Sequence, residues 1–309
     1  MSLSIRLLGT SASRPTVERN VASVAIHREG ETLMFDCGEG TQRQMMRYGV
    51  SFALEDIFFT HMHADHLLGV IGLIRTMALQ GRAERLRLWG PRGSSRMLKR
   101  VEALGFERAT FPVEILEVEA GQRIPRKDYE IVGFPVDHRG SASLGYAIVE
   151  AERKGRFNPD LARELGIPEG PLWGKIHRGE DVTLDDGRVI ASRTLVGDKR
   201  PGRTVVITGD TRPCAATIEA SRGADLLLHE ATFGDEEATR AVETGHSTAR
   251  EAAGVARDAA VRRLVLTHFS ARYSRDASEL DREAKSVFAE TLIGKDGMEI
   301  EVPFQSSSA

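Results

Sequence analysis

Four apolar segments, far apart in the sequence, each end in a residue that can bind a metal ion. IVGFPVDH ends in His138, VVITGD in Asp210, DLLLHE in His229 and Glu230, and RLVLTH in His268. Segments this rich in Val, Ile and Leu are typical of buried strands. One such histidine is commonly a structural residue with satisfied hydrogen bonds. Four segments with the same kind of ending favour a fold that gathers these ends at one edge of its sheets.

A fifth apolar segment, IFFT, leads directly into HMHADH at residues 61–66. His61 and His63 lie two residues apart, so an extended chain points both side chains to one side. Asp65 and His66 follow where the chain is expected to turn into a helix, and their side chains point elsewhere. The cluster therefore supplies part of two metal sites, and the strand ends supply the remaining donors. We predict a two-metal centre.

Two metal ions about 3.5–4 Å apart activate a bridging water and stabilise the charge that develops during hydrolysis. Asp210 is predicted to bridge the ions, because each carboxylate oxygen can bind one of them. Asp65 is predicted to bind the second ion and to accept the proton of the attacking water. The histidine-rich donor set favours Zn²⁺, with Mn²⁺ and Fe²⁺ as alternatives. The predicted chemistry is metal-assisted hydrolysis.

Strand-like segments alternate with segments of helical periodicity along the chain. We expect strands at residues 3–8, 21–26, 32–35, 56–60, 85–89, 113–118, 130–134, 144–149, 204–208, 225–229 and 263–267. We expect helices at residues 40–48, 66–80, 94–104, 159–165, 212–222, 248–258 and 277–291. Two sheets packed face to face with helices outside, an αββα sandwich of the α/β class, fit this pattern better than a doubly wound parallel sheet.

Residues 151–193 interrupt the alternation with a polar segment that is rich in glycine and proline. Only residues 159–165 look helical there, so the segment is expected to be weakly structured. A long excursion of this kind inside a compact domain is usually functional or disordered. Because core-like strands flank it, we predict one domain over residues 1–309 with an insertion at about 151–193.

The composition excludes several classes of protein. The net charge of −3 gives no general sign of a nucleic-acid partner. Apolar runs are far shorter than the ~20 residues of a membrane span, and the N-terminal run is too short for a signal peptide. Cys37 and Cys214, the only cysteines, form no CxxC motif and indicate no disulfide framework. We therefore expect a cytoplasmic protein without membrane contact.

The histidine motif and its partners resemble the metallo-β-lactamase superfamily, and further motifs resemble its ribonuclease Z family almost from end to end. These motifs are GTSASRPTVERN at residues 9–20, FDCGEGTQRQM at 35–45, THMHADHLLG at 60–69, HRGSASLGY at 138–146, TGDTR at 208–212, HEATF at 229–233, HST at 246–248 and LTHFSARY at 266–273. The insertion is similar to the family's flexible exosite arm, including its Gly-Pro pair. HEATF, HST and SARY together are more specific than the histidine motif.

The resemblance implies a metallo-β-lactamase fold and a zinc-dependent endoribonuclease, with two Zn²⁺ per subunit. The enzyme would cleave precursor tRNA after the acceptor stem and leave a 3′-hydroxyl on the tRNA. One zinc would bind His61, His63 and His138; the other would bind Asp65, His66 and His268; Asp210 would be shared. Asp65 would be the general base. His246 and Glu230 would form the pair that protonates the leaving oxygen. Alternatively, Glu230 would support a zinc ligand by a hydrogen bond.

The resemblance implies that Arg19, Gly170, Pro171 and Arg272 contact the substrate. The implied partners are precursor tRNA and a second copy of the chain, which would form a homodimer. DNA is not expected as a partner. Two features depart from the family pattern. Val17 stands where the family usually has lysine, which leaves Arg19 as the expected cation of that loop. Residues 151–180 contain six Lys/Arg and five Asp/Glu, an excess of only +1 for an arm that would bind RNA phosphates.

Two other functions are compatible with these motifs. One is a small-molecule phosphodiesterase or related hydrolase of the same superfamily, which would not need the insertion. The other is a catalytically silent RNA-binding module, which would not need seven intact metal donors. Metal content and cleavage of a 3′-extended precursor tRNA discriminate between these alternatives.

Overall fold

A computed structural model describes residues 2–104 and 110–305 of the chain. Two seven-stranded mixed sheets form its largest part. The first sheet has the order β16 (Glu299–Glu301), β1 (Leu3–Gly9), β2 (Ser23–Arg28), β3 (Glu31–Phe35), β4 (Asp56–Phe58), β5 (Leu86–Pro91) and β6 (Val113–Val118). The second has the order β15 (Thr291–Ile293), β14 (Leu264–Thr267), β13 (Leu226–Glu230), β12 (Thr204–Ile207), β9 (Leu144–Glu150), β8 (Tyr129–Pro135) and β7 (Arg123–Pro125).

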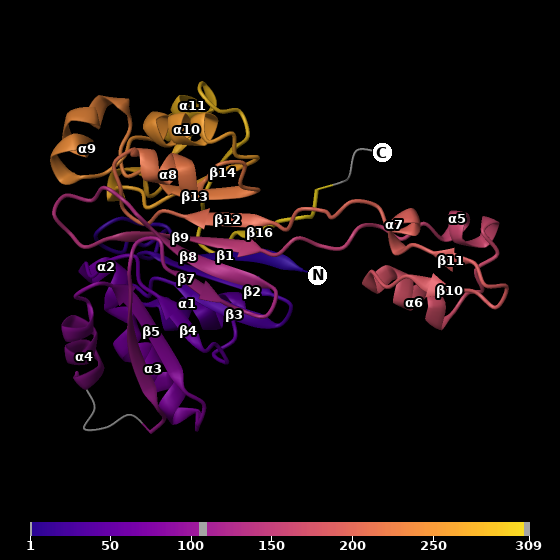
Figure 1. The fold of residues 1–309 in the computed structure, drawn as a ribbon. Helices are drawn as coiled ribbons and strands as arrows, with labels where there is room; N and C mark the ends of the chain where they lie inside the picture. Colours follow the sequence, from indigo (N-terminus) through magenta and orange to yellow (C-terminus); the bar gives the residue numbers. More distant parts are fainter. Residues whose placement is uncertain (1, 105–109, 306–309) are drawn as a thin grey trace. The chain divides into compact units, whose positions relative to one another are not determined.

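Outside the insertion, the helices fall into two groups along the chain (Figure 1). The first group is α1 (Thr41–Tyr48), α2 (Ala64–Leu67), α3 (Gly69–Leu79) and α4 (Ser95–Ala103). The second is α8 (Ala215–Ala220), α9 (Ala238–Thr244), α10 (Ala249–Asp258) and α11 (Ser278–Lys285), with 3₁₀ turns η1 (Asp235–Glu237) and η2 (Ala271–Tyr273). None of the helices in the described part of the chain combines the length and apolar character needed to cross a membrane.

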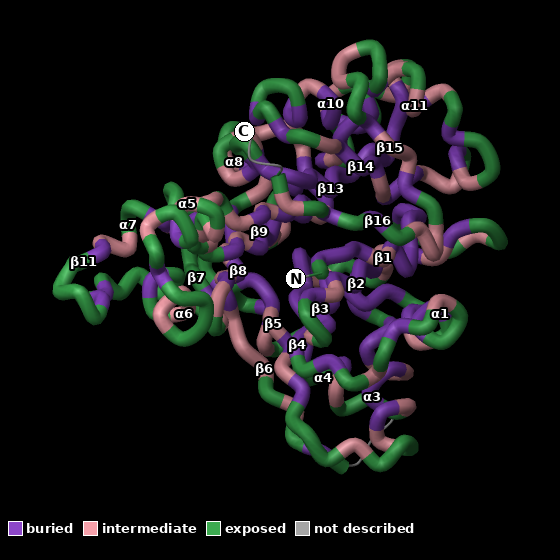
Figure 2. The backbone as a smooth tube through the Cα atoms, turned by 90° about the vertical axis from the view of Figure 1, so that its right-hand side faces the viewer, coloured by how far each residue is buried: buried purple, intermediate pink, exposed green. Residues whose placement is uncertain are grey.

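The two sheets pack face to face through alternating side chains of their strands. Tyr146 of β9 contacts Phe35 of β3 and Phe58 of β4, with ring centroids 5.7 and 5.5 Å apart. Its hydroxyl donates a hydrogen bond of 2.9 Å to the carbonyl of Phe59. Neighbouring residues along each strand point the other way, as the two-residue period of a strand requires. Figure 2 shows that the strands of both sheets are mostly buried.

The outer face of each sheet is covered by one helix group, which completes the sandwich. Met45, Leu73 and Leu98, from α1, α3 and α4, pack with Met34 and Ile57 of the first sheet. The buried alanines of α10 and Leu280 of α11 pack with Leu227 and Leu266 of the second. The predicted αββα fold is therefore confirmed.

The described chain divides into two compact units. Unit 1 holds the sandwich and comprises Met1–Arg126, Glu130–Val149 and Thr204–Pro303. Unit 2 comprises Lys127–Tyr129, Glu150–Arg203 and the described residues from Phe304 onward. The inserted segment of unit 2 contains α5 (Pro159–Glu164), α6 (Pro171–Arg178), β10 (Val182–Thr183), β11 (Val189–Ile190) and α7 (Ser192–Leu195).

The insertion is structured, so the expectation of a weakly structured segment was wrong. Residues 157–195, which we call the head, bury an apolar cluster of their own. This cluster comprises Ala162, Ile167, Ile176, Val182, Leu184, Ile190 and Leu195. The two connecting segments, residues 150–156 and 196–203, form what we call the stem. They pair through backbone hydrogen bonds from Glu150 N to Arg203 O, in both directions between Arg153 and Arg200, and from Gly197 N to Arg156 O.

Candidate metal centre

The metal-binding residue types lie at strand ends, as the apolar segments predict. β12, β13 and β14 are parallel neighbours, so their carboxyl ends lie at the same edge of the second sheet. Asp210, Glu230 and His268 therefore come close together there. In the first sheet, β4 leads through two residues into the loop that begins at His61. His229, although it also ends a strand, belongs to neither donor group and hydrogen-bonds through Nδ1 to the carbonyl of Glu230.

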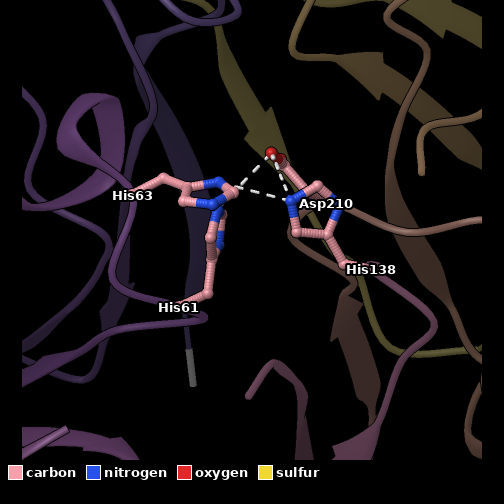
Figure 3. A group of neighbouring side chains, drawn as sticks. All are labelled: His61, His63, His138 and Asp210. Carbon is pink, nitrogen blue, oxygen red and sulfur yellow. Dashed lines mark hydrogen bonds and ion pairs between the residues drawn. The ribbon is translucent and has the colours of Figure 1, made fainter. Parts of the chain in front are cut away.

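The first donor group comprises His61, His63, His138 and Asp210, whose ligand-type atoms all lie within 4.8 Å of one another. Figure 3 shows the three imidazoles and the carboxylate converging from both sheets. Nδ1 of His63 lies 3.3 Å from Nε2 of His138. Nε2 of His61 lies 3.6 Å from Oδ2 of Asp210. His61, His138 and Asp210 are buried and His63 is exposed, which leaves one side of this group open to a substrate.

The second donor group comprises Asp65, His66 and His268, and Asp210 lies between the two groups. Its Oδ1 atom is 3.3 Å from Nε2 of His66 and 3.2 Å from Nε2 of His268. Its Oδ2 atom instead lies on the side of His61 and His138. One oxygen faces each group, which is the arrangement that a bridging carboxylate needs.

Hydrogen bonds behind the rings fix which nitrogen of each histidine faces the centre. Nδ1 of His66 lies 2.8 Å from Oδ2 of Asp36, and Nδ1 of His138 lies 2.9 Å from the carbonyl of Gly245. Nδ1 of His268 is held in the same way by Thr232 at 3.0 Å. His61 is held by Thr60, also at 3.0 Å. Each contact leaves Nε2 free for a metal, and such contacts orient metal ligands in proteins.

Asp36 was not among the predicted site residues, although it follows β3 as the predicted donors follow their strands. Besides His66 it binds Thr60, accepting hydrogen bonds from its backbone N–H at 2.8 Å and from its hydroxyl. Asp36 and His268 both have positive φ angles, 56° and 58°. Such angles cost roughly 1–3 kcal/mol in a residue other than glycine, and this strain is concentrated at the centre.

Two glycines allow the loop after β3 to approach α2 closely enough for Asp36 to reach His66. A Cβ atom on Gly69 would lie 1.8 Å from the carbonyl oxygen of Gly38. The backbone N–H of Cys37 donates to the carbonyl of His66 at 2.7 Å, and that of Gly69 donates to the carbonyl of Cys37 at 2.8 Å. A side chain at either glycine would separate these segments, so both positions require glycine.

The donor set fits divalent metal ions. Ligands about 2.0–2.1 Å from a tetrahedral ion lie about 3.4 Å from each other. The distances between neighbouring donor atoms in the two groups are 3.2–3.9 Å. Nε2 of His61 and Oδ1 of Asp210 are buried without any hydrogen-bond partner among the described residues. A bound cation would satisfy both atoms, because buried polar groups are otherwise costly.

The partly buried His246 and the buried Glu230 form a pair next to the second donor group. Nδ1 of His246 lies 2.8 Å from Oε1 of Glu230. Oε2 of Glu230 accepts hydrogen bonds from the backbone N–H and the hydroxyl of Thr232. Burial alone would lower the pKa of His246, but the negative charge of Glu230 outweighs it and raises the pKa to about 9. This contact brings together the two residues that the family resemblance pairs.

A cleft of about 390 Å³ opens beside His246 and is lined in part by three arginines, Arg14, Arg240 and Arg272. The side chain of Arg272 is 58% exposed and pairs with Glu237. Of the predicted substrate contacts, Arg272 therefore lies where a phosphate near the centre could reach it. Residues 12–14 of the N-terminal loop line the same cleft. The backbone N–H of Ser13 donates to Oδ2 of Asp65 at 2.7 Å.

Arg19 differs from what the sequence suggested, because its side chain is only 6% exposed. Its guanidinium donates to the hydroxyl of Thr10 and the carbonyl of Gly294, both at 2.7 Å, and stacks on the ring of Phe269. These contacts give it a role in holding the N-terminal loop, so a phosphate contact is not supported. Gly170 and Pro171 lie in the other compact unit, where Pro171 is the first residue of α6.

Comparisons with known proteins agree with this fold and site. The family model described as "Beta-lactamase superfamily domain" matches residues 31–195 and 191–269. Together with the two-sheet sandwich, this match defines a protein of the metallo-β-lactamase class. The chain is 69% identical to the ribonuclease Z of Gemmatimonas aurantiaca, over 98% of this chain and 96% of that protein. It is 52% identical to the ribonuclease Z of Myxococcus xanthus, over 98% and 99%.

The chain therefore belongs to the ribonuclease Z family, as its motifs predicted. The crystal structure of the short form of human tRNase Z is similar to the whole chain, with a TM-score of 0.70 and 26% sequence identity. The alignment covers 97% of this chain and all of the human one. The insertion is thus part of the region over which the two chains are compared.

Proposed function

We propose that this protein is an endoribonuclease that cleaves precursor tRNA on the 3′ side of the acceptor stem. It removes the 3′ trailer and leaves a 3′-hydroxyl on the tRNA. The observation that carries this proposal is Asp210 between two donor groups, in a chain 69% identical to a ribonuclease Z over nearly its full length. The similarity to human tRNase Z supports tRNA as the substrate.

The two donor groups would hold two Zn²⁺ ions per subunit, with His61, His63 and His138 at one ion, Asp65, His66 and His268 at the other, and Asp210 at both. Metal bound there supplies a Lewis acid and a water of lowered pKa. Histidine nitrogens with carboxylate oxygens favour Zn²⁺ over Mg²⁺ or Ca²⁺, whereas Mn²⁺ and Fe²⁺ accept similar donors. Activity measured after reconstitution with each ion identifies the one that works.

Asp65 is the general base of the proposed reaction. Its Oδ2 atom is fixed by the N–H of Ser13 at 2.7 Å and lies 3.4 Å from Nε2 of His268. Burial alone would raise the pKa of Asp65, but the neighbouring His268 and His66 together outweigh it and lower the pKa, so the carboxylate is ionised at neutral pH. It can therefore accept a proton from the attacking water.

His246 donates the proton that the leaving 3′-oxygen requires. Glu230 holds Nδ1 of its ring, which leaves Nε2 for the substrate, and the ring lines the cleft beside the centre. Glu230 itself is fixed by Thr211 and Thr232, so it orients the imidazole and stabilises its charged form. Arg272 in the same cleft is proposed to contact a phosphate of the RNA.

The insertion is proposed to be the exosite arm that binds tRNA away from the cleaved bond, with Gly170 and Pro171 at its substrate-facing part. The head buries its own apolar cluster, which supports a preformed binding element rather than a segment that orders only on binding. We also propose a cytoplasmic homodimer, in keeping with the family resemblance.

Incubation of the purified protein with a 3′-extended precursor tRNA tests the proposal. The expected product is the tRNA with a 3′-hydroxyl, and Asp65→Ala should abolish it. A small diester such as bis(p-nitrophenyl) phosphate is the parallel substrate. Hydrolysis of this diester without any cleavage of precursor tRNA would favour a small-molecule phosphodiesterase. Absence of both activities in protein loaded with two metal equivalents would favour a silent RNA-binding module.

A further inference from the structure

The nearly neutral charge of the insertion conceals an uneven distribution between stem and head. The head has five Lys/Arg and seven Asp/Glu, so its net charge is −2. The stem has six Lys/Arg and three Asp/Glu, so its net charge is +3. The basic residues of the stem are Arg153, Lys154, Arg156, Lys199, Arg200 and Arg203.

Arginines of the head are largely neutralised by neighbouring carboxylates. Arg163 pairs with both Asp160 at 2.8 Å and Glu169 at 2.9 Å. Arg178 pairs with Glu180 at 2.9 Å, and Arg188 pairs with Asp186 at 2.7 Å. A phosphate approaching these arginines would have to compete with a carboxylate that is already in place. The head is therefore a poor electrostatic partner for RNA.

Most cations of the stem have no such partner. Arg203 forms a buried pair with Glu150 at 2.8 Å, and Lys199 lies 3.3 Å from Glu152. The other four are Arg153, Lys154, Arg156 and Arg200. Across residues 2–104 and 110–305, no carboxylate lies within 4 Å of the charged group of any of the four.

The fold of the stem brings these cations close together. Arg153 and Arg200 lie directly opposite each other in an antiparallel bridge, hydrogen-bonded in both directions. Like charges in that position repel each other. Arg153 and Arg203 both stack on Phe304, at 3.5 and 3.8 Å from its ring centroid. The pKa of Arg153 is lowered by burial first, and also by the positive charges of Arg200 and Arg203.

We propose that the stem is the phosphate-binding surface of the insertion, and that Lys154, Arg156 and Arg200 contact the backbone of the RNA substrate. This inference rests on the proposed function and assigns its RNA contacts within the insertion. Phosphate oxygens would offset the repulsion among the cations and release counterions on binding. The head then contributes shape and backbone contacts, in which charge has little part.

The test compares two triple variants that remove the same charge. The stem variant is Lys154→Gln/Arg156→Gln/Arg200→Gln, and the head variant is Arg163→Gln/Lys175→Gln/Arg178→Gln. Binding of precursor tRNA is measured against salt concentration with the metal-loaded full chain. We expect the stem variant to bind at least about tenfold more weakly at 0.1 M salt, with the slope of log K against log salt reduced by about two. The head variant should change affinity less than about threefold.

Hydrolysis of bis(p-nitrophenyl) phosphate reports on the metal centre separately, and both variants should keep it within about twofold. A stem variant that retains Lys154 and carries Arg156→Lys/Arg200→Lys should keep most of the affinity, since the charges remain. This conservative variant distinguishes lost charge from a distorted stem.

Two results would overturn the inference: an unchanged salt slope in the stem variant, or a loss of affinity in the head variant as large as that in the stem variant. Failure of the proposed function has a different signature. In that case the wild-type protein does not cleave precursor tRNA at all, while binding of a labelled RNA hairpin still measures what the stem contributes.

Discussion

Asp36 illustrates that the metal centre depends on residues that never face the metal. It holds Nδ1 of His66 at 2.8 Å and also fixes Thr60, which in turn contacts His61. A single buried carboxylate thus orients ligands of both donor groups. Its positive φ angle shows that the backbone is held in an unfavourable conformation to place it there.

Replacement of Asp36 by asparagine should weaken metal binding although no ligand is removed. Without the negative charge, the imidazole of His66 is a weaker donor, and we expect a loss of about 10–100-fold in metal affinity. Competition with a chromogenic chelator measures it. Asp56→Asn is the matched control, since Asp56 is equally buried but pairs with Arg87 and Arg126. It should lower stability and leave metal affinity unchanged. Equal effects of the two variants would contradict the orienting role of Asp36.

Replacement of His246 by glutamine separates proton donation from metal binding. If His246 protonates the leaving oxygen, kcat for precursor tRNA should fall by about 10²–10⁴-fold while two metal equivalents remain bound. Hydrolysis of bis(p-nitrophenyl) phosphate should fall far less, because p-nitrophenolate leaves without a proton. A parallel loss on both substrates would indicate instead that His246 supports the metal ligands.

Residues of the site were predictable from sequence where a simple geometric rule applied. His138, Asp210 and His268 end apolar segments, and the ends of parallel strands share an edge. The same rule would have identified Asp36 after β3, but an aspartate followed by CGEG also looks like the start of a turn. Arg19 could not be assigned, because its burial depends on contacts with residues more than 250 positions away in sequence.

At the scale of elements, the stem consists of two segments that pair with each other and connect the head to the rest of the chain. Its two segments are hydrogen-bonded from Glu150 to Gly197, and a Cβ atom on Gly155 would lie 1.7 Å from the carbonyl oxygen of Gly197. This close approach explains a glycine at that position. The pairing also provides a place where the chain can be shortened without stretching the backbone.

Removal of the insertion should abolish tRNA processing and spare the metal centre. Because Arg153 and Arg200 are direct partners, a short Gly-Ser linker between Glu152 and Pro201 can close the chain. We expect kcat/KM for precursor tRNA to fall at least about 10²-fold because KM rises. Hydrolysis of the diester should stay within about threefold of the wild-type rate, since the metal donors all lie in the other unit. Unchanged tRNA cleavage would remove the support for the exosite arm.

Most elements of the sandwich followed from sequence, because each of these has several apolar residues in a regular period. The exceptions are the short strands β7, β15 and β16 and the helix α9, which were not predicted. Of the elements of the insertion, only α5 followed from sequence. β10 and β11 have two residues each, and α6 begins with Gly170 and Pro171, which read as a loop. The apolar cluster of the head is built from single residues in separate short elements. No local window of sequence contains enough of them to reveal a core.

At the scale of the whole molecule, metal removal should lower thermal stability, because donors from both sheets would face one another without a cation. At metal concentrations about 100-fold above Kd, binding stabilises the folded state by about 2.7 kcal/mol. For a unit of this size that corresponds to a shift in Tm of about 5–10 °C. Scanning calorimetry before and after chelation, with Zn²⁺ added back, measures it. A double variant His61→Ala/His268→Ala should show no response to Zn²⁺.

The centre draws its donors from positions 61 to 268, and neither sheet carries a complete set. The order of synthesis then matters, since a growing chain releases His61, His63 and His66 early and His268 only near the end. A growing chain shorter than 268 residues lacks the last donor and cannot complete the centre. A nuclease assembled in this way stays inactive while it is being made beside the RNA that surrounds it. Its activity begins only when nearly the whole sandwich can close.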